Sequence, residues 1–299
     1  MGIVDKKYGF LDFVKVMYVA LTLVATVSLM LNVLLLRVNY RRKVWAVDVV
    51  LMSLIAAVDI VADCFQILTQ ILHEATDGKV AQSDNWWCYS SMILLRALGV
   101  AAIDLTALLA LVRYIAIVKG RSLRANRWVW SGAGIVGSLL VIFVIRLNIS
   151  RLQLVPSDMH CVFAWKKPSV ANRILNVLIS VYIMPPIIVI PFCYFSIVRH
   201  YNILLDAIQS DCMSCTEKAS RGKIKVLFVI VIAYMLAVLP EYAMTLAHIV
   251  YKAETSPALD AITKVLYSCS NILNASLALV AHDGIYSELA SQEINPSNI

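Results

Sequence analysis

Charged residues are scarce in this sequence. They make up 15% of its 299 residues, against about 25% in an ordinary soluble domain, whereas hydrophobic residues make up 61%. The mean hydropathy is +0.79. A chain of this length could bury a core, but it has too few polar side chains to cover one in water. We therefore expect lipid to cover the remaining apolar surface.

Other absences exclude further classes of protein. The chain contains no soluble domain, internal repeat or low-complexity segment, and no cleavable signal peptide is evident. No span combines clustered histidines and acids or an activated nucleophile, so we expect neither an enzyme nor a metal centre. No groove of aromatic and basic residues indicates a nucleic-acid partner.

The chain instead contains seven long apolar segments. A helix needs about 17–25 residues to cross a bilayer, and each segment reaches that length. The sequence therefore predicts an all-α membrane protein: a seven-transmembrane helix bundle that forms one domain over residues 1–299, with a short amphipathic helix after the last span. The predicted spans are 12–37, 44–73, 87–118, 128–147, 174–199, 223–251 and 258–281.

Basic residues in the short loops predict the orientation. The loops after the first and third spans are basic and hold no acid, whereas the opposite loops mix both signs, and the basic segment between the fourth and fifth spans is a counterweight. Since basic loops stay in the cytoplasm, we expect the N-terminus outside and the C-terminus inside, in the plasma membrane. The net charge of +7 then indicates contact with anionic lipid.

Cys88 and Arg113 lie near the two ends of the third span. They are 25 positions apart, which is roughly 37 Å in a helix and enough to leave one residue on each side of a bilayer. Of the seven cysteines, only Cys88 and Cys161 fall at outer positions, which makes them candidates for a disulfide. Asn148 begins a glycosylation sequon just outside the fourth span.

Several polar side chains fall at similar depths inside the spans. An ionisable group in hydrocarbon costs at least about 2.5 kcal/mol, so each one needs an explanation. One interpretation is a polar cluster that holds a sodium ion or waters; the other is a hydrogen-bond network that only fixes helix packing. Asp63 and Asp104 are further acids that either pair structurally or take part in function. The cluster would consist of Asn32, Asp59, Asn271 and Asn274.

A second polar group lies in the outer halves of the later spans. Arg96 either forms a buried pair with Glu241 or Asp63, or contacts a charged ligand. Lys264, near the outer end of the seventh span, either contacts the ligand or extends to the interface. Pro240 precedes Glu241 and bends its helix, which makes it a candidate hinge. The candidate ligand-binding residues are Arg96, Glu241, Tyr242, Lys264 and Ser268.

At their spacing, these residues resemble the rhodopsin-like G-protein-coupled receptors over nearly the whole chain. Val112-Arg113-Tyr114 is similar to the family's Asp-Arg-Tyr motif, and Cys88 precedes Arg113 by the family's separation. Asn274 takes the place of the asparagine in the family's Asn-Pro-x-x-Tyr motif. Further positions that match the family are Asn32, Asp59, Pro186, Tyr194 and Pro240.

The resemblance implies a mechanism. A Cys88–Cys161 disulfide would hold the second outer loop, and a small molecule or peptide would bind among the outer halves of the spans. The sixth span would then swing outward about Pro240, with Pro186 as a second hinge, and open a cleft for a heterotrimeric G protein. Membrane lipid and a second receptor copy are further expected partners. The residues implied in G-protein coupling are Arg113, Tyr114, Tyr194, Lys223 and Lys225.

The sequence also departs from the family. Val112 replaces the acid that normally pairs with the arginine, so we expect a looser resting state and raised basal activity. Val238 and Tyr234 replace the tryptophan and phenylalanine of the sixth span. Ala275 and Ala278 replace the proline and tyrosine of the seventh-span motif. Coupling to a G protein could therefore be atypical, reduced or absent.

Three other functions stay open. Lys264 follows Asp260 by four residues, a spacing that resembles that of the retinal lysine in microbial rhodopsins and would suit a retinal-binding photoreceptor. Lys264 lies close to the outer membrane surface, however, and Ser268 occupies the position where animal opsins carry their lysine. A proton- or ion-coupled transporter would rest on Asp59, Asp63 and Asp104, although the paired, interrupted spans of inverted repeats are missing. The third is a seven-span scaffold that acts only by dimerising with other receptors.

Overall fold

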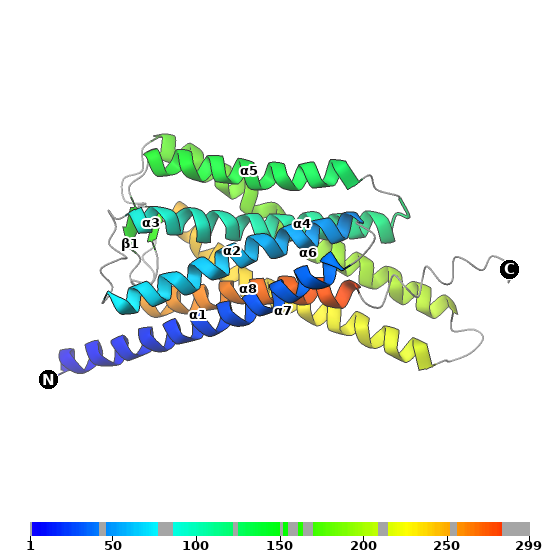
Figure 1. The fold of residues 1–299 in the computed structure, drawn as a ribbon, viewed down its shortest axis with the longest axis horizontal. Coiled ribbons are helices and arrows are strands. Elements are labelled where there is room, and N and C mark those ends of the chain that lie inside the picture. Colours follow the sequence, from blue (N-terminus) through cyan, green and yellow to red (C-terminus); the bar gives the residue numbers. More distant parts are fainter. Residues whose placement is uncertain are drawn as a thin grey trace.

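The apolar segments of the sequence fold into long helices that lie side by side (Figure 1). The computed structural model describes residues 2–41, 46–76, 86–121, 125–149, 152–154, 161–163, 170–208, 215–251 and 256–282. Helix α3, the π-helical turn η2 and helix α4 follow one another directly, so the described residues form seven helical rods. The helices are α1 (Gly2–Tyr40), α2 (Val47–Ala75), α3 (Trp86–Ser91), η2 (Met92–Ala97), α4 (Leu98–Ile117), α5 (Ala125–Ile149), α6 (Val170–Ile208), α7 (Cys215–Tyr251) and α8 (Pro257–His282).

Each predicted span overlaps one of these rods along nearly its whole length. Helices α6 and α7 continue well beyond the predicted spans 174–199 and 223–251. A helix does not have to end where the hydrocarbon ends, because residues with good helix propensity extend it. The amphipathic helix predicted after the last span falls on residues 283–299, which lie outside the described residues.

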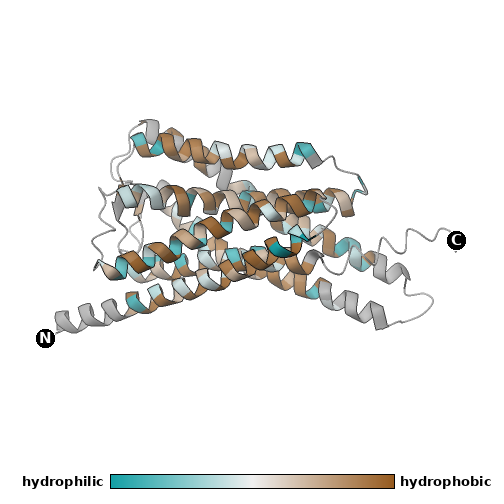
Figure 2. Ribbon diagram, viewed as in Figure 1, coloured by the Kyte–Doolittle hydropathy of each residue, from teal (hydrophilic) through white to brown (hydrophobic). Residues whose placement is uncertain are grey.

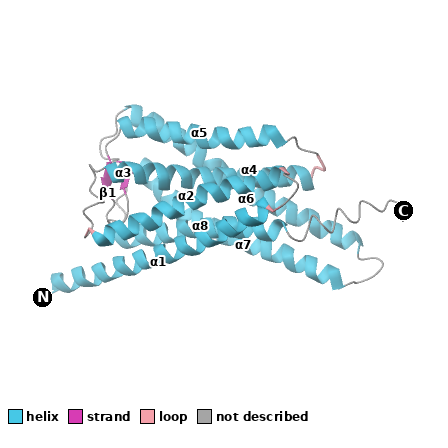
Figure 3. Ribbon diagram, viewed as in Figure 1, coloured by secondary structure: helices cyan, strands magenta, loops and turns pink. Residues whose placement is uncertain are grey.

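A short hairpin departs from the all-α prediction (Figure 3). Strands β1 (Leu152–Leu154) and β2 (Cys161–Phe163) pair antiparallel, with Leu154 opposite Cys161. A disulfide joins Cys161 to Cys88 of α3, so the hairpin is attached to this end of the bundle. Three-residue strands are too short to leave an alternating pattern in the sequence. We call the end of the bundle that carries β1 and β2 the hairpin end.

The helices pack around α4. This helix contacts α2, α5 and α6, while α8 contacts both α1 and α7 and closes the bundle on the other side. Figure 1 shows the helices running roughly along the long axis of the molecule, with the chain entering α4 at the hairpin end and leaving it at the opposite end. The largest apolar cluster joins α4 to the helices α5 to α8, and a second one joins it to α1 and α2.

The bundle exposes apolar side chains and buries polar ones. Leu23, Met30 and Leu236 are 62%, 67% and 65% exposed, whereas Asp59 and Arg113 are 1% and 2% exposed. Figure 2 shows apolar residues along the helices. Large exposed apolar surfaces mark contact with another molecule or a membrane. Within the residues that the structure describes, four helices are long and apolar enough, by length and composition, to cross a bilayer: Phe13–Tyr40, Trp86–Ile117, Asn126–Asn148 and Ile224–Ala247. These features indicate a membrane location.

Candidate functional site

A polar network occupies the middle of the bundle. Asn274 of α8 donates from Nδ2 to Asp59 Oδ2 of α2 at 3.2 Å. The Oδ1 of the same amide accepts a hydrogen bond from Thr106 Oγ1 of α4 at 3.0 Å. One asparagine therefore joins three helices, and both of its polar atoms have partners. This is the arrangement that a buried amide needs, since an unsatisfied polar group in the interior is costly.

A second carboxylate, one helical turn further along α2, forms a neighbouring hydrogen-bonded group. Asp63 accepts from Ser28 Oγ of α1 at 2.5 Å and from Asn271 Nδ2 of α8 at 2.9 Å. Asn32 donates from Nδ2 to the carbonyl oxygen of Ser28 at 3.1 Å and to its Oγ at 3.2 Å. The predicted residues therefore fall into two hydrogen-bonded groups one turn apart on α2. Asp59 bonds to Asn274, whereas Asp63 bonds to Asn271 and, through Ser28, is connected to Asn32. Three further residues complete the two groups. These are Ser28, Asp63 and Thr106.

The oxygen atoms of this network are better ligands for a hard monovalent cation than for a transition metal. Two carboxylates lie one turn apart on α2, and Asn32 Oδ1 is buried with no described hydrogen-bond partner. Oxygen ligands of this kind suit hard cations. In the described part of the chain, no three His, Cys, Asp or Glu side chains come together as a metal group. Asp59, Asp63 and Asn32 are the residues that would hold a sodium ion.

Charged residues also meet near the hairpin end. Arg96 lies in the π-helical turn η2, and its Nη1 donates to Glu241 Oε1 of α7. Glu241 is buried, while the Arg96 side chain is 19% exposed. The sequence also allows a pair between Arg96 and Asp63, but the Asp63 carboxylate accepts hydrogen bonds from Ser28 and Asn271 instead. Single π-helical turns often occur at functional sites, because they rotate a side chain out of the regular helical register.

Lys264 of α8 is buried beside this ion pair. Its Nζ lies 5.5 Å from the centre of the Tyr267 ring, and the residue is 4% exposed, so the side chain does not extend to the surface of the bundle. Tyr242 is buried as well, and its hydroxyl has no described partner. Ser268 donates to the carbonyl oxygen of Lys264 at 3.0 Å, which uses its hydroxyl within its own helix.

A glycine makes room for one of the aromatic rings. An added Cβ on Gly99 of α4 would lie 2.7 Å from Tyr267 Oη and 3.3 Å from the ring. The side chain of Tyr267 therefore lies directly against the backbone of α4. Its hydroxyl is buried without a described partner. A larger residue at position 99 would therefore meet the Tyr267 side chain.

Arg113 lies at the opposite end of α4. It is buried, and it donates from Nη1 to Tyr194 Oη of α6 at 3.1 Å and from Nη2 to Met52 Sδ of α2 at 3.2 Å. Val112, before it, is buried in the apolar core. Tyr114 is partly buried, with its ring 5.8 Å from that of Phe192. Arg113 therefore connects α4 with α2 and α6.

The remaining predicted residues lie apart from these groups. Pro186 lies within α6 and Pro240 within α7. Asn148 is exposed near the end of α5. Lys225 is exposed on α7, whereas the side chain of Lys223 lies outside the described part of the structure.

Comparisons with known proteins establish the fold. No protein-family model matches the sequence, and no curated protein does either. The crystal structure of squid rhodopsin matches the structure with a TM-score of 0.69 at 14% identity, and the match covers 95% of this chain and 86% of that chain. The fold is rhodopsin-like. At an identity this low, the match shows only that the helices are arranged alike. The chemistry of the sites has to be inferred from the residues of this chain.

Three features of this rhodopsin-like bundle could not be found from sequence motifs. Ser28 and Thr106 complete the central network, yet serine and threonine are common in membrane helices. The close approach of Tyr267 to Gly99 depends on how α4 faces α8. Ser28 could have been found from its spacing, because it lies four residues before Asn32 and therefore on the same helical face.

Proposed function

We propose that this chain is a seven-transmembrane receptor with its N-terminus outside the cell. It binds a small molecule or peptide near Arg96 and Glu241 and activates a heterotrimeric G protein at the Arg113 end. The observation that carries the proposal is the continuous rod α3–η2–α4, which holds Arg96 near one end and Arg113 near the other. Both arginines contact other helices, so a change at one end can alter helix contacts at the other.

The proposed signal begins at the Arg96–Glu241 pair. A ligand that contacts either side chain competes with this pair and loosens the connection between η2 and α7. Pro240 directly precedes Glu241, and a proline in a helix removes a backbone hydrogen bond and allows it to bend. Bending at this point moves the part of α7 that packs beside α6. A cleft then opens beside Arg113 and Tyr194, where the G protein binds.

The decisive experiment is nucleotide exchange on purified G proteins by the chain in lipid vesicles, screened against small molecules and peptides. We expect at least one ligand to accelerate exchange, and Arg113→Ala to lose that acceleration while still binding the ligand. A ligand that binds at Arg96 or Glu241 without any effect on exchange, across all G-protein classes, would contradict the proposed coupling.

Basal activity tests the role of Val112. Because no acid precedes Arg113, we expect nucleotide exchange above background without ligand, and Val112→Asp should reduce it by supplying a carboxylate. Val112→Asn is the matched control, since it has a similar size and polarity but no charge. Equal effects of the two substitutions, or exchange at background that does not fall in Val112→Asp, would count against this part of the proposal.

We also propose that the central network binds a sodium ion at Asp59, with Asp63 and Asn32 beside it. The expected result is a higher unfolding temperature in sodium chloride than in choline chloride at equal ionic strength. Asp59→Asn should remove the difference, because it takes away the carboxylate charge while keeping a side chain of the same shape. An unchanged difference in this variant would argue against the site.

A retinal-binding photoreceptor is the second candidate, because Lys264 is a buried amine beside aromatic rings. A covalent retinal adduct would produce a visible absorption band after incubation with retinal. That band should disappear in Lys264→Ala and persist in Lys225→Ala, whose lysine is exposed on the outside of α7. The absence of a band in the unaltered chain removes this candidate and leaves the receptor proposal untouched.

A further inference from the structure

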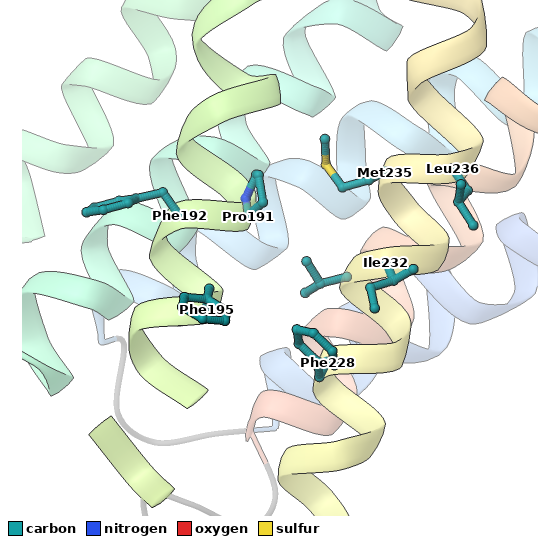
Figure 4. Close-up of a pocket in the computed structure, with 8 residues that line it drawn as sticks. Pro191, Phe192, Phe195, Phe228, Ile232, Met235 and Leu236 are labelled. Atoms are coloured by element: carbon teal, nitrogen blue, oxygen red, sulfur yellow. The ribbon is translucent and has the colours of Figure 1, made fainter. Parts of the chain in front are cut away.

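Helices α6 and α7 leave an apolar groove between them, which we call the α6–α7 groove. Its volume is about 410 Å³. Figure 4 shows side chains of both helices around it. The residues that line it are Pro191, Phe192, Phe195, Phe228, Val231, Ile232, Met235 and Leu236.

The groove opens on the outer face of the bundle. Phe192, Phe195 and Leu236 are 58%, 59% and 65% exposed, whereas Val231, which also lines the groove, is buried. Every lining side chain is apolar, so nothing in the groove could hold a polar ligand. In a membrane, the molecules that reach such a face are lipids, and an acyl chain is complementary to a narrow apolar groove.

Two cations flank one end of the groove. Arg199 follows Phe195 by four residues on α6, and Lys225 precedes Phe228 by three residues on α7, so each continues the face that lines the groove. Since α6 and α7 are consecutive antiparallel helices, both cations lie at the same end, away from the hairpin. They stand about 6 Å and about 4.5 Å beyond those phenylalanines along the helix axes.

Both cations are accessible to a ligand from outside the bundle. Arg199 and Lys225 are both exposed, and neither forms an ion pair with another residue of the described ranges. Arginine matches the geometry of a phosphate with its planar fork of donors, while lysine adds a mobile positive charge. Basic side chains at a membrane surface attract anionic lipids. The groove therefore combines an apolar channel with a positive end.

We propose that the α6–α7 groove is a binding site for an anionic phospholipid. One acyl chain lies against Phe195, Phe228 and Val231, and the phosphate of the headgroup lies between Arg199 and Lys225. The negatively charged headgroup of the lipid contacts the two cations, and its acyl chain contacts the apolar side chains of the groove. The site requires neither a G protein nor an extracellular ligand, so it stands or fails independently of the proposed receptor activity.

The test is lipid binding to the purified full-length chain in detergent, measured by native mass spectrometry with phosphatidylglycerol and phosphatidylcholine of the same acyl chains. The unaltered chain should retain phosphatidylglycerol in preference. The double variant Arg199→Gln/Lys225→Gln should lower that preference by about fivefold or more. Arg121→Gln/Arg127→Gln is the matched control, because it removes two exposed cations near the same end of the bundle and should leave the preference unchanged.

A second pair of variants tests the groove itself. Ile232→Trp fills the groove and should displace the lipid while both cations remain, whereas Val229→Trp adds the same bulk at an exposed position of α7 that does not line it. The proposal is overturned if Arg199→Gln/Lys225→Gln keeps the preference, if the control pair loses it equally, or if Ile232→Trp binds as much lipid as Val229→Trp. Displacement of the phospholipid by a sterol or by a second copy of the chain also overturns it.

Discussion

Two arginines on one continuous helical rod are held in different ways. Arg96 and Arg113 are about 25 Å apart along the rod. Arg96 donates to the carboxylate of Glu241, so its charge is neutralised by an acid on α7. The Arg113 guanidinium donates hydrogen bonds to the Tyr194 hydroxyl of α6 and to the Met52 sulfur of α2.

The difference indicates which end of the rod is held more firmly. Breaking a buried ion pair leaves an uncompensated charge and is strongly destabilising, whereas hydrogen bonds from a charged donor to neutral acceptors contribute less. The Arg96 end also has the Cys88–Cys161 disulfide nearby. The hairpin end combines an ion pair with a disulfide, and we therefore expect it to resist rearrangement.

The largest effect should come from breaking the ion pair. Glu241→Gln leaves the Arg96 charge without its acid, and we expect a loss of about 3 kcal/mol in the free energy of unfolding, since Arg96 keeps some exposure. Denaturant unfolding in detergent micelles measures it. Arg96→Gln/Glu241→Gln removes both charges and should recover most of the loss. A double variant as unstable as the single one would mean that the pair is not what holds η2 to α7.

The Arg113 end should respond less strongly. Tyr194→Phe removes the hydroxyl that accepts from Arg113 Nη1 and keeps the ring, so we expect a loss of about 1.5–3 kcal/mol, the range for a hydrogen bond to a charged group. The same unfolding assay compares it with Glu241→Gln. Tyr242→Phe controls for the removal of a buried tyrosine hydroxyl that has no described hydrogen-bond partner. A loss from Tyr194→Phe that exceeds the loss from Glu241→Gln would reverse the comparison between the two ends.

The smallest effect should come from crowding the hairpin half of the rod. In Gly99→Ala the new methyl group meets Tyr267 Oη, and overpacking of this kind costs about 1–3 kcal/mol. Tyr267→Phe removes the clashing atom, so Gly99→Ala/Tyr267→Phe should regain stability. Gly134→Ala on α5 is the matched control, since nothing lies within 4 Å of its added Cβ. The absence of rescue in the double variant would show that α4 and α8 separate more easily than the contact implies.

Much of the fold could be predicted from the sequence. Each predicted span coincides with one of the seven helical rods of the described residues, because long apolar segments of the length that a bilayer requires are easy to detect. The hairpin was missed, since strands of three residues have no pattern to detect. The π-helical turn at Met92–Ala97 was missed too, because its sequence is compatible with an ordinary helix.

The sites were predictable to different degrees. The polar residues of the central network could be predicted from the sequence, because an acid or an amide in an apolar span is costly and rare. Their hydrogen-bond partners could not be predicted. Asp63 accepts from Ser28 and Asn271, although a pair with Arg96 was also compatible with the sequence. Which partner a buried charge finds depends on the rotation of each helix about its own axis.

The sequence by itself determined that the chain has little charge, that it contains long apolar segments, and that a few polar residues lie within them. These are properties of composition and spacing. Only the tertiary structure decided that Arg96 meets Glu241, that Arg113 meets Tyr194, and that α6 and α7 leave a groove with a positive end. Such contacts join helices far apart in the chain, and angstrom-scale packing of their side chains selects them.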